Sequence, residues 1–183
     1  MIEDELFAAI DPIMKDCGAI PEEGEEYQAP PLDVLRYYRR PVRLHWIPWL
    51  GRALSVVAVV RQPVDVGFAA DGAAYHRFLT RLAMAVNGRF PPWKGDRGLV
   101  IGLTTLVLTP EPIGPDEDKA LALSMKPLGR TRVVPLGLLR VNLGQEALSF
   151  ALASDPDKLF PEPELLTDAL TPKFRRYVSL YTE

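Results

Sequence analysis

One stretch of the sequence, residues 36–52, combines residue types that bind other molecules. It reads RYYRRPVRLHWIPWLGR and holds five arginines, one histidine, two tyrosines and two tryptophans, with no acidic residue. A guanidinium group donates a planar fork of hydrogen bonds to a carboxylate or a phosphate, and aromatic rings offer faces for stacking. The same residue types supply many of the energetically dominant contacts in protein–protein interfaces. The stretch therefore indicates binding chemistry.

Three interpretations of this stretch remain open at the level of sequence. Tyr37, Trp46 and Trp49 could anchor the core while the arginines pair with the acidic residues 1–33. It could instead bind a protein partner, or it could bind single-stranded nucleic acid, which is held by the same mixture of cations and rings. Added salt separates the last two interpretations, because binding to phosphates weakens steeply as the salt concentration rises.

A second basic and aromatic stretch lies between a predicted helix and a predicted strand. Residues 89–98 read RFPPWKGDRG. They exceed the length of about 4–6 residues that usually connects such elements. Aromatic residues on exposed loops often carry function. The stretch is therefore either a binding loop or a connector whose Phe90 and Trp93 fold back over the end of the sheet.

The partner-binding residues predicted from these two stretches are all arginine, lysine, histidine or tryptophan. They are Arg36, Arg39, Arg40, Arg43, His45, Trp46, Trp49, Arg89, Trp93, Lys94 and Arg97. We expect a non-enzymatic interaction or scaffold protein that recognises a protein partner through them. A nucleic-acid-binding module on the same surface is the first alternative, and an enzyme assembled from scattered acids and histidines is the second.

The sequence carries none of the common signatures of cofactor or metal binding. It has no glycine-rich phosphate cradle and no G-x-S-x-G nucleophile turn. Two histidines and one cysteine cannot fill the usual zinc ligand sets, so we expect no cofactor and no zinc. Cys17 is expected to be a partly buried packing residue and His76 a surface or half-buried side chain. The acidic run 116–118 is expected to be a solvated hairpin loop.

Charges are segregated along the chain, although the net charge is only −3. Residues 1–33 hold ten acids and one lysine, whereas residues 34–110 hold eleven bases and three acids. Charge asymmetry of this kind bears on partners and association rather than on the fold. We expect residues 1–33 to pack against the basic region and to screen it from adventitious polyanions.

Length and composition are typical of one globular domain. The chain has 183 residues, of which 48% are hydrophobic and 25% charged, enough for a sizeable core. The single cysteine excludes an internal disulfide and fits a reducing compartment. The sequence MIEDELF is acidic where a secretory signal is basic, and the apolar run 98–108 is shorter than the roughly 20 residues that a bilayer requires. We expect a soluble, cytoplasmic protein that contacts no membrane; its oligomeric state stays open.

Apolar periodicity predicts the elements that position the binding residues. The runs 53–60 and 99–108 are typical of strands covered on both faces. Strands are also expected over 119–126, over 132–143 with Pro135 at an edge or a bulge, and over 147–153. A helix capped by Asp71 should stop near Asn87-Gly88. Its apolar stripe is Tyr75, Phe78, Leu79, Leu82 and Val86.

The two ends of the chain are expected to be helical or irregular. A first helix should be interrupted at Asp11-Pro12 and should stop at Gly18. A loop or ordered arm is expected over 20–31, followed by a short helix over 32–40. A last helix should begin at Thr171-Pro172.

These elements define an α+β fold in one structural domain. After residue 50 the expected order is β-α-β-β-β-β-α, which gives a mixed, mostly antiparallel sheet of about five strands with helices packed on it. Residues 1–33 should form an acidic N-terminal helix and arm, and residues 34–183 the α+β domain.

The two longest apolar runs generate a stability prediction. Val57, Val59, Ile101, Leu103 and Leu106 should be buried in neighbouring central strands. A Val57→Asp variant should unfold the domain, because an unpaired buried carboxylate costs several kcal/mol against a total stability of about 5–15 kcal/mol. Thermal melting of the purified variant measures this effect, and an unchanged melting temperature would contradict the prediction.

Overall fold

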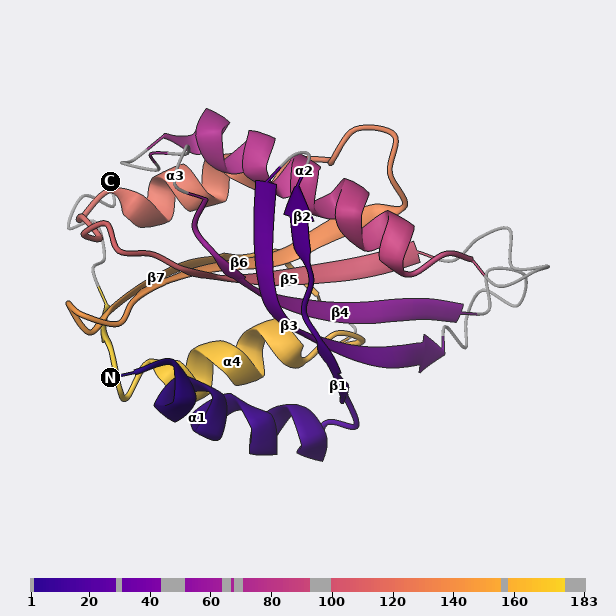
Figure 1. The fold of residues 1–183 in the computed structure, drawn as a ribbon, viewed down its shortest axis with the longest axis horizontal. Coiled ribbons are helices and arrows are strands. Elements are labelled where there is room, and N and C mark those ends of the chain that lie inside the picture. The colour runs from indigo at the N-terminus through magenta and orange to yellow at the C-terminus, as the bar shows by residue number, and fades with distance from the viewer. Residues whose placement is uncertain are drawn as a thin grey trace.

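Helices cover both faces of one mixed β-sheet (Figure 1). The computed structural model describes residues 2–28, 31–43, 52–63, 67, 71–92, 100–155 and 158–176. Helices α2 (Gly72–Arg89) and α3 (Glu117–Ser124) cover one face of the sheet, and α1 (Glu3–Asp16) and α4 (Glu162–Leu170) cover the other. Two apolar cores result, one on each side of the sheet.

The strand order in the sheet is β1-β3-β4-β5-β6-β7-β8, and β2 also pairs with β3. The strands are β1 (Ile20–Glu23), β2 (Glu26–Gln28), β3 (Pro31–Arg43), β4 (Arg52–Arg61), β5 (Val100–Leu108), β6 (Val133–Asn142), β7 (Ala147–Leu152) and β8 (Arg175–Arg176). Strands β4, β5 and β6 are parallel, and β3 and β7 flank them in antiparallel pairing. The predicted α+β class, single domain and mixed sheet are confirmed. The described part of the chain holds eight strands, more than the sequence predicts.

The two longest apolar runs form β4 and β5 in the centre of the sheet. These strands pair in parallel, with Val57 opposite Thr104. The predicted burial is confirmed, since five predicted core residues are at most 1% exposed: Val57, Val59, Ile101, Leu103 and Leu106. Both faces of these strands are covered by helices, which is why their sequences are continuously apolar.

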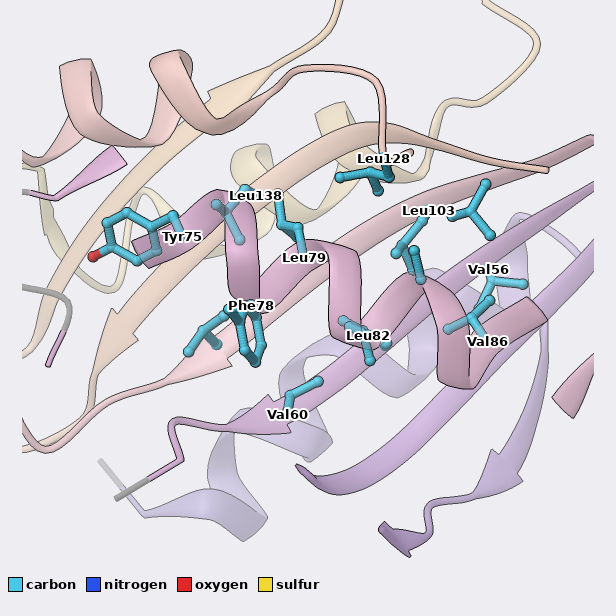
Figure 2. Close-up of a cluster of buried hydrophobic side chains, with 14 of the residues drawn as sticks. Val56, Val60, Tyr75, Phe78, Leu79, Leu82, Val86, Leu103, Leu128 and Leu138 are labelled. Atoms are coloured by element: carbon cyan, nitrogen blue, oxygen red, sulfur yellow. The ribbon is translucent and has the colours of Figure 1, made fainter. Parts of the chain in front are cut away.

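Helix α2 supplies most of the apolar layer on its side of the sheet. The side chain of Asp71 accepts a hydrogen bond from the backbone N–H of Ala73 at 2.9 Å, which confirms the predicted N-cap. Figure 2 shows Phe78, Leu82 and Val86 of this helix beside side chains of the central strands. The helix ends at Arg89, just beyond the predicted stop.

Two predicted elements have the wrong type. Residues 32–40, predicted as a short helix, lie in strand β3. Residues 117–124, within the predicted strand 119–126 and the acidic run before it, form helix α3. The buried residues of α3 are Glu117, Ala120, Leu121 and Ser124, a spacing that only a helix brings to one face. The alternation of leucines misled the prediction because Leu123 points to solvent and is 62% exposed.

The predictions for the two ends of the chain need similar corrections. Helix α1 continues through Pro12, whose ring is exposed, because buried side chains before and after it hold the helix against the sheet. Gly18 has a φ of +83°, which confirms the predicted stop. The predicted loop or arm over 20–31 holds β1 and β2. No helix begins at Thr171 in the described residues; α4 ends at Leu170 and β8 follows.

The strands after α3 agree with the sequence. Pro135 lies at a bulge, because the β5–β6 register shifts from Leu103↔Pro135 to Thr104↔Gly137. The predicted strand over 147–153 is β7.

Among the described helices, none is both long and apolar enough to cross a membrane.

Gly24 separates β1 from β2, and both strands pair with the same edge of β3. Opposite this glycine, β3 bulges between Val34 and Arg36. A Cβ atom on Gly24 would lie 1.7 Å from the carbonyl oxygen of Val34. The edge of the sheet therefore closes only around a residue without a side chain.

Gly24→Ala should lower the free energy of unfolding by about 1–3 kcal/mol, because the backbone must move away from the new methyl group. Urea denaturation of the purified variant measures the loss. The control is Gly88→Ala in helix α2, where a Cβ would meet no atom within 4 Å. That change should stabilise the protein by about 0.5–1 kcal/mol. Equal stability of the two variants would contradict the packing described for Gly24.

Candidate functional site

The arginines of β3 divide between the two faces of the sheet. Side chains alternate along a strand, so Arg36 and Arg40 point toward α1 and α4. Arg36 Nη1 lies 2.8 Å from both carboxylate oxygens of Asp11, and Arg40 Nε donates to Glu162 Oε1 at 2.5 Å. These two predicted binding residues therefore help to attach the helices of that layer.

Three other predicted arginines lie within the described residues: Arg39 and Arg43 in β3, and Arg89 at the C-terminal end of α2. Arg43 lies directly opposite Arg52 in the β3–β4 pair, and both residues are exposed. Arg39 and Arg89 contact the same carboxylate, that of Glu22. Another arginine, at position 132, donates from Nε to Asn87 of α2 at 3.1 Å. We call five residues the basic edge: Arg39, Arg43, Arg52, Arg89 and Arg132.

The strand residues that flank the two stretches singled out in the sequence lie at the same end of the parallel strands. Ala53 of β4 lies opposite Val100 of β5 in parallel register. The connection between Arg43 and Arg52 and the connection that leads to Val100 therefore start and end at the same ends of the strands (Figure 1). Six predicted binding residues belong to these connections and lie outside the described residues: His45, Trp46, Trp49, Trp93, Lys94 and Arg97.

Carboxylates and a helix end stabilise part of the basic edge. The C-terminal end of an α-helix carries a partial negative charge that favours nearby cations. Arg39 Nε donates to one oxygen of Glu22, whose other oxygen lies 3.5 Å from Arg89 Nη2. Arg89 Nη1 also donates to Glu25, and the Arg89 guanidinium lies 5.9 Å from the ring centre of Tyr37.

The predicted packing of residues 1–33 against the basic region is confirmed. Carboxylates of this segment form ion pairs with four arginines: Asp11 with Arg36, Glu22 with Arg39, Glu3 with Arg61, and Glu25 with Arg89. Exposed pairs contribute only about 0–1 kcal/mol each, so their main effect is on the local electrostatic potential. Screening of polyanions by these pairs stays a prediction.

Arg43 differs from Arg39 and Arg89, which both contact carboxylates. Directly opposed residues on neighbouring antiparallel strands have Cβ atoms about 4.5–5.5 Å apart, and like charges in that position destabilise the pair. Arg43 makes no ion pair with any other described residue. The strand pairing thus places two exposed arginines directly opposite each other.

The most deeply buried charges lie at the opposite ends of the parallel strands. Arg140 of β6 is 0% exposed. Its Nη1 donates to Glu117 Oε1 at 2.6 Å, and its Nη2 donates to Thr109 Oγ1 at 2.9 Å and to Glu111 Oε2 at 3.3 Å. Because Thr109 follows β5 and Glu117 begins α3, this Arg140 network joins three elements at the carboxyl ends of the strands.

The Arg140–Glu117 pair at the centre of the network is buried. In α/β sheets, ligands bind at the carboxyl ends of parallel strands, at the point where the strand order reverses. Strands β4, β5 and β6 lie in sequence order, with α2 and α3 on the same face, so these three strands contain no such reversal. Glu117 is 2% exposed and also accepts a hydrogen bond from Tyr75 Oη. Burial raises the pKa of Glu117 above its ordinary value, while Arg140 acts in the opposite direction.

The sequence analysis missed Arg140 and misassigned Glu117. The run 116–118 was expected to be a solvated hairpin loop, but Glu117 is buried against Arg140. An arginine within the apolar run 132–143 was a usable signal, because a buried guanidinium requires a buried carboxylate.

The remaining predicted residues have structural environments. Cys17 is half-buried, and its Sγ lies 3.1 Å from the carbonyl oxygen of Met14; burial raises the pKa of this thiol. His76 is half-buried, with Nδ1 3.1 Å from the carbonyl oxygen of Ser124. The environments predicted for both residues are confirmed. No cluster of three metal-ligating side chains occurs within the described ranges.

Comparison with protein-family models, curated proteins and solved structures finds no match for this chain. Interpretation of the basic edge therefore depends on its own geometry and charge.

Removing the carboxylate of Glu117 should destabilise the protein. Glu117→Ala should lower the free energy of unfolding by about 3–5 kcal/mol, because it deprives a buried guanidinium of its closest counter-charge. Urea denaturation measures the loss, with Asp118→Ala as the neighbouring control at less than about 1 kcal/mol. The double variant Glu117→Leu/Arg140→Met should recover much of the stability. A Glu117→Ala variant as stable as the control would show that the ion pair is dispensable.

Proposed function

We propose that this protein recognises a protein partner through the basic edge, and that the partner presents an acidic segment there. The observation that carries the proposal is Arg43, an exposed arginine that lies opposite Arg52 and makes no ion pair with any other described residue. A carboxylate that accepts hydrogen bonds from the Arg43 guanidinium would form a charge-assisted contact, which is stronger than a contact between neutral groups.

The sheet topology supports the same surface. The two connections that hold the predicted tryptophans start and end beside Arg43, Arg52 and Val100. Arginine and tryptophan are the residue types most enriched among the dominant contacts of protein interfaces. An acidic segment with apolar side chains would match this combination of guanidinium groups and aromatic rings.

A carboxylate ligand is favoured over a nucleic acid by two observations. Glu22 already lies between Arg39 and Arg89, so this surface binds a carboxylate within its own chain. Nucleic-acid-binding domains are usually strongly basic, whereas the net charge of this chain is −3.

The proposal predicts that the basic edge binds an acidic peptide and that Arg43 and Arg52 are required. A fluorescein-labelled peptide rich in glutamate and leucine should bind the wild-type protein in fluorescence anisotropy titrations. Arg43→Gln/Arg52→Gln should weaken binding by about tenfold or more, because hydrogen bonds to charged groups are worth about 1.5–3 kcal/mol. The fold of the variant is checked by circular dichroism and thermal melting.

The matched control removes the same charge elsewhere. Lys15→Gln/Lys173→Gln neutralises two exposed lysines that form no ion pair within the described ranges, and it should leave peptide binding unchanged. Equal weakening of peptide binding by both double variants would show that the effect comes from net charge alone. Tighter binding of a single-stranded oligonucleotide than of the peptide, lost in the arginine variant and steeply dependent on salt, would assign the surface to nucleic acid instead.

A further inference from the structure

We infer that Glu22 and Glu25 compete with the partner's carboxylates for the arginines of the basic edge. In the free protein, part of the basic edge is therefore already bound by carboxylates of its own chain. The inference rests on the proposed function and adds a regulatory contact to it. Its basis is the pair of glutamates that form ion pairs with Arg39 and Arg89.

Glu22 occupies the position that a partner's carboxylate would take. One of its oxygens accepts from Arg39 Nε, and the other lies 3.5 Å from Arg89 Nη2. The two arginines come from different elements, β3 and α2, so the carboxylate bridges them. Glu25 binds the remaining side of Arg89 through Nη1. Both guanidinium groups therefore have carboxylate ligands before any partner arrives.

These contacts are exchangeable because they are open to water. The side chains of Glu22 and Glu25 are 23% and 40% exposed, and those of Arg39 and Arg89 are 39% and 28% exposed. Exposed ion pairs are weak and screened by salt, so an incoming carboxylate can replace them at little cost. Glu117, in contrast, is 2% exposed and sealed against Arg140.

The backbone keeps the two glutamates close to the arginines after their side chains have moved away. Glu22 pairs with Tyr37 in the β1–β3 register, and the carbonyl oxygen of Glu25 accepts from the N–H of Val34 at 3.0 Å. A tethered group competes at a high effective concentration. An external acidic segment therefore binds with reduced apparent affinity unless it also contacts parts of the surface that the glutamates leave open, such as Arg43.

Neutralising the competitors should strengthen binding. Glu22→Gln/Glu25→Gln should bind the glutamate- and leucine-rich peptide about threefold to tenfold more tightly than wild type, since the exposed pairs it weakens are individually small. The matched control is Glu23→Gln/Glu26→Gln. It makes the same change of charge at neighbouring positions, on exposed residues without ion pairs to other described residues, and it should bind as wild type does. Anisotropy at low salt gives the dissociation constants.

Two further variants identify the groups through which the glutamates act. Adding Arg39→Gln/Arg89→Gln to Glu22→Gln/Glu25→Gln should abolish the gain in affinity. If Glu22→Gln/Glu25→Gln does not fold, as judged by circular dichroism, Glu25→Gln alone is the replacement, because Glu25 lies in the turn between β1 and β2 rather than in a strand. It should give a smaller gain, since the contact of Glu22 with Arg39 and Arg89 remains.

The possible outcomes separate the inference from the function on which it rests. Peptide binding that needs Arg43 and Arg52 but is unchanged by Glu22→Gln/Glu25→Gln overturns the competitor role and leaves the proposed function standing. A gain of equal size in Glu23→Gln/Glu26→Gln also overturns it, because the effect is then general charge. If neither the wild-type protein nor any folded variant binds the peptide, the proposed function and the competitor role are overturned together.

Discussion

Burial of both faces of the parallel strands β4, β5 and β6 is the constraint on which the other elements depend. Parallel neighbours need crossover connections, and α2 and α3 supply them on one face of the sheet. The opposite face must then be covered by segments from the two ends of the chain, which are α1 and α4. Residues 1–33 are therefore part of the core: Leu6, Ile10 and Met14 are 0% exposed. An acidic segment that the sequence suggests to be a separate arm is thus packed into the folded domain.

This arrangement gives the two ends of the parallel strands different properties. At the carboxyl ends, the buried Arg140 contacts the buried residues Glu117 and Thr109 and the partly exposed Glu111. At the amino ends, the chain returns through the connection after Arg43 and the one before Val100, and the arginines around α2 remain half-buried or exposed. Binding of a partner is therefore proposed at the amino ends, where several half-buried or exposed arginines lie close together.

The sequence predicts well those features that depend on neighbouring residues in the chain. Strands β4 and β5 and the helix capped by Asp71 were found from local apolar patterns. Strand β3 and helix α3 were assigned the wrong type because their short amphipathic patterns are ambiguous and packing decides between helix and strand. Arginines that could bind were found by composition, but strand alternation sent Arg36 and Arg40 to the far face. The partner of Arg40 is Glu162, a long-range contact that no local pattern contains.

Ion pairs of the same chemistry have opposite consequences in this molecule because they differ in exposure. Arg140 and Glu117 are both buried, so separating them would leave unpaired charges in the core, and their contact is a fixed part of the fold. Glu22 and Arg39 remain in partial contact with water, which solvates each group when the pair opens. A partner's carboxylate can exchange with Glu22 but has no route to Arg140. Exposure, rather than the number of charges on a segment, therefore decides which of the protein's carboxylates can give way to a partner.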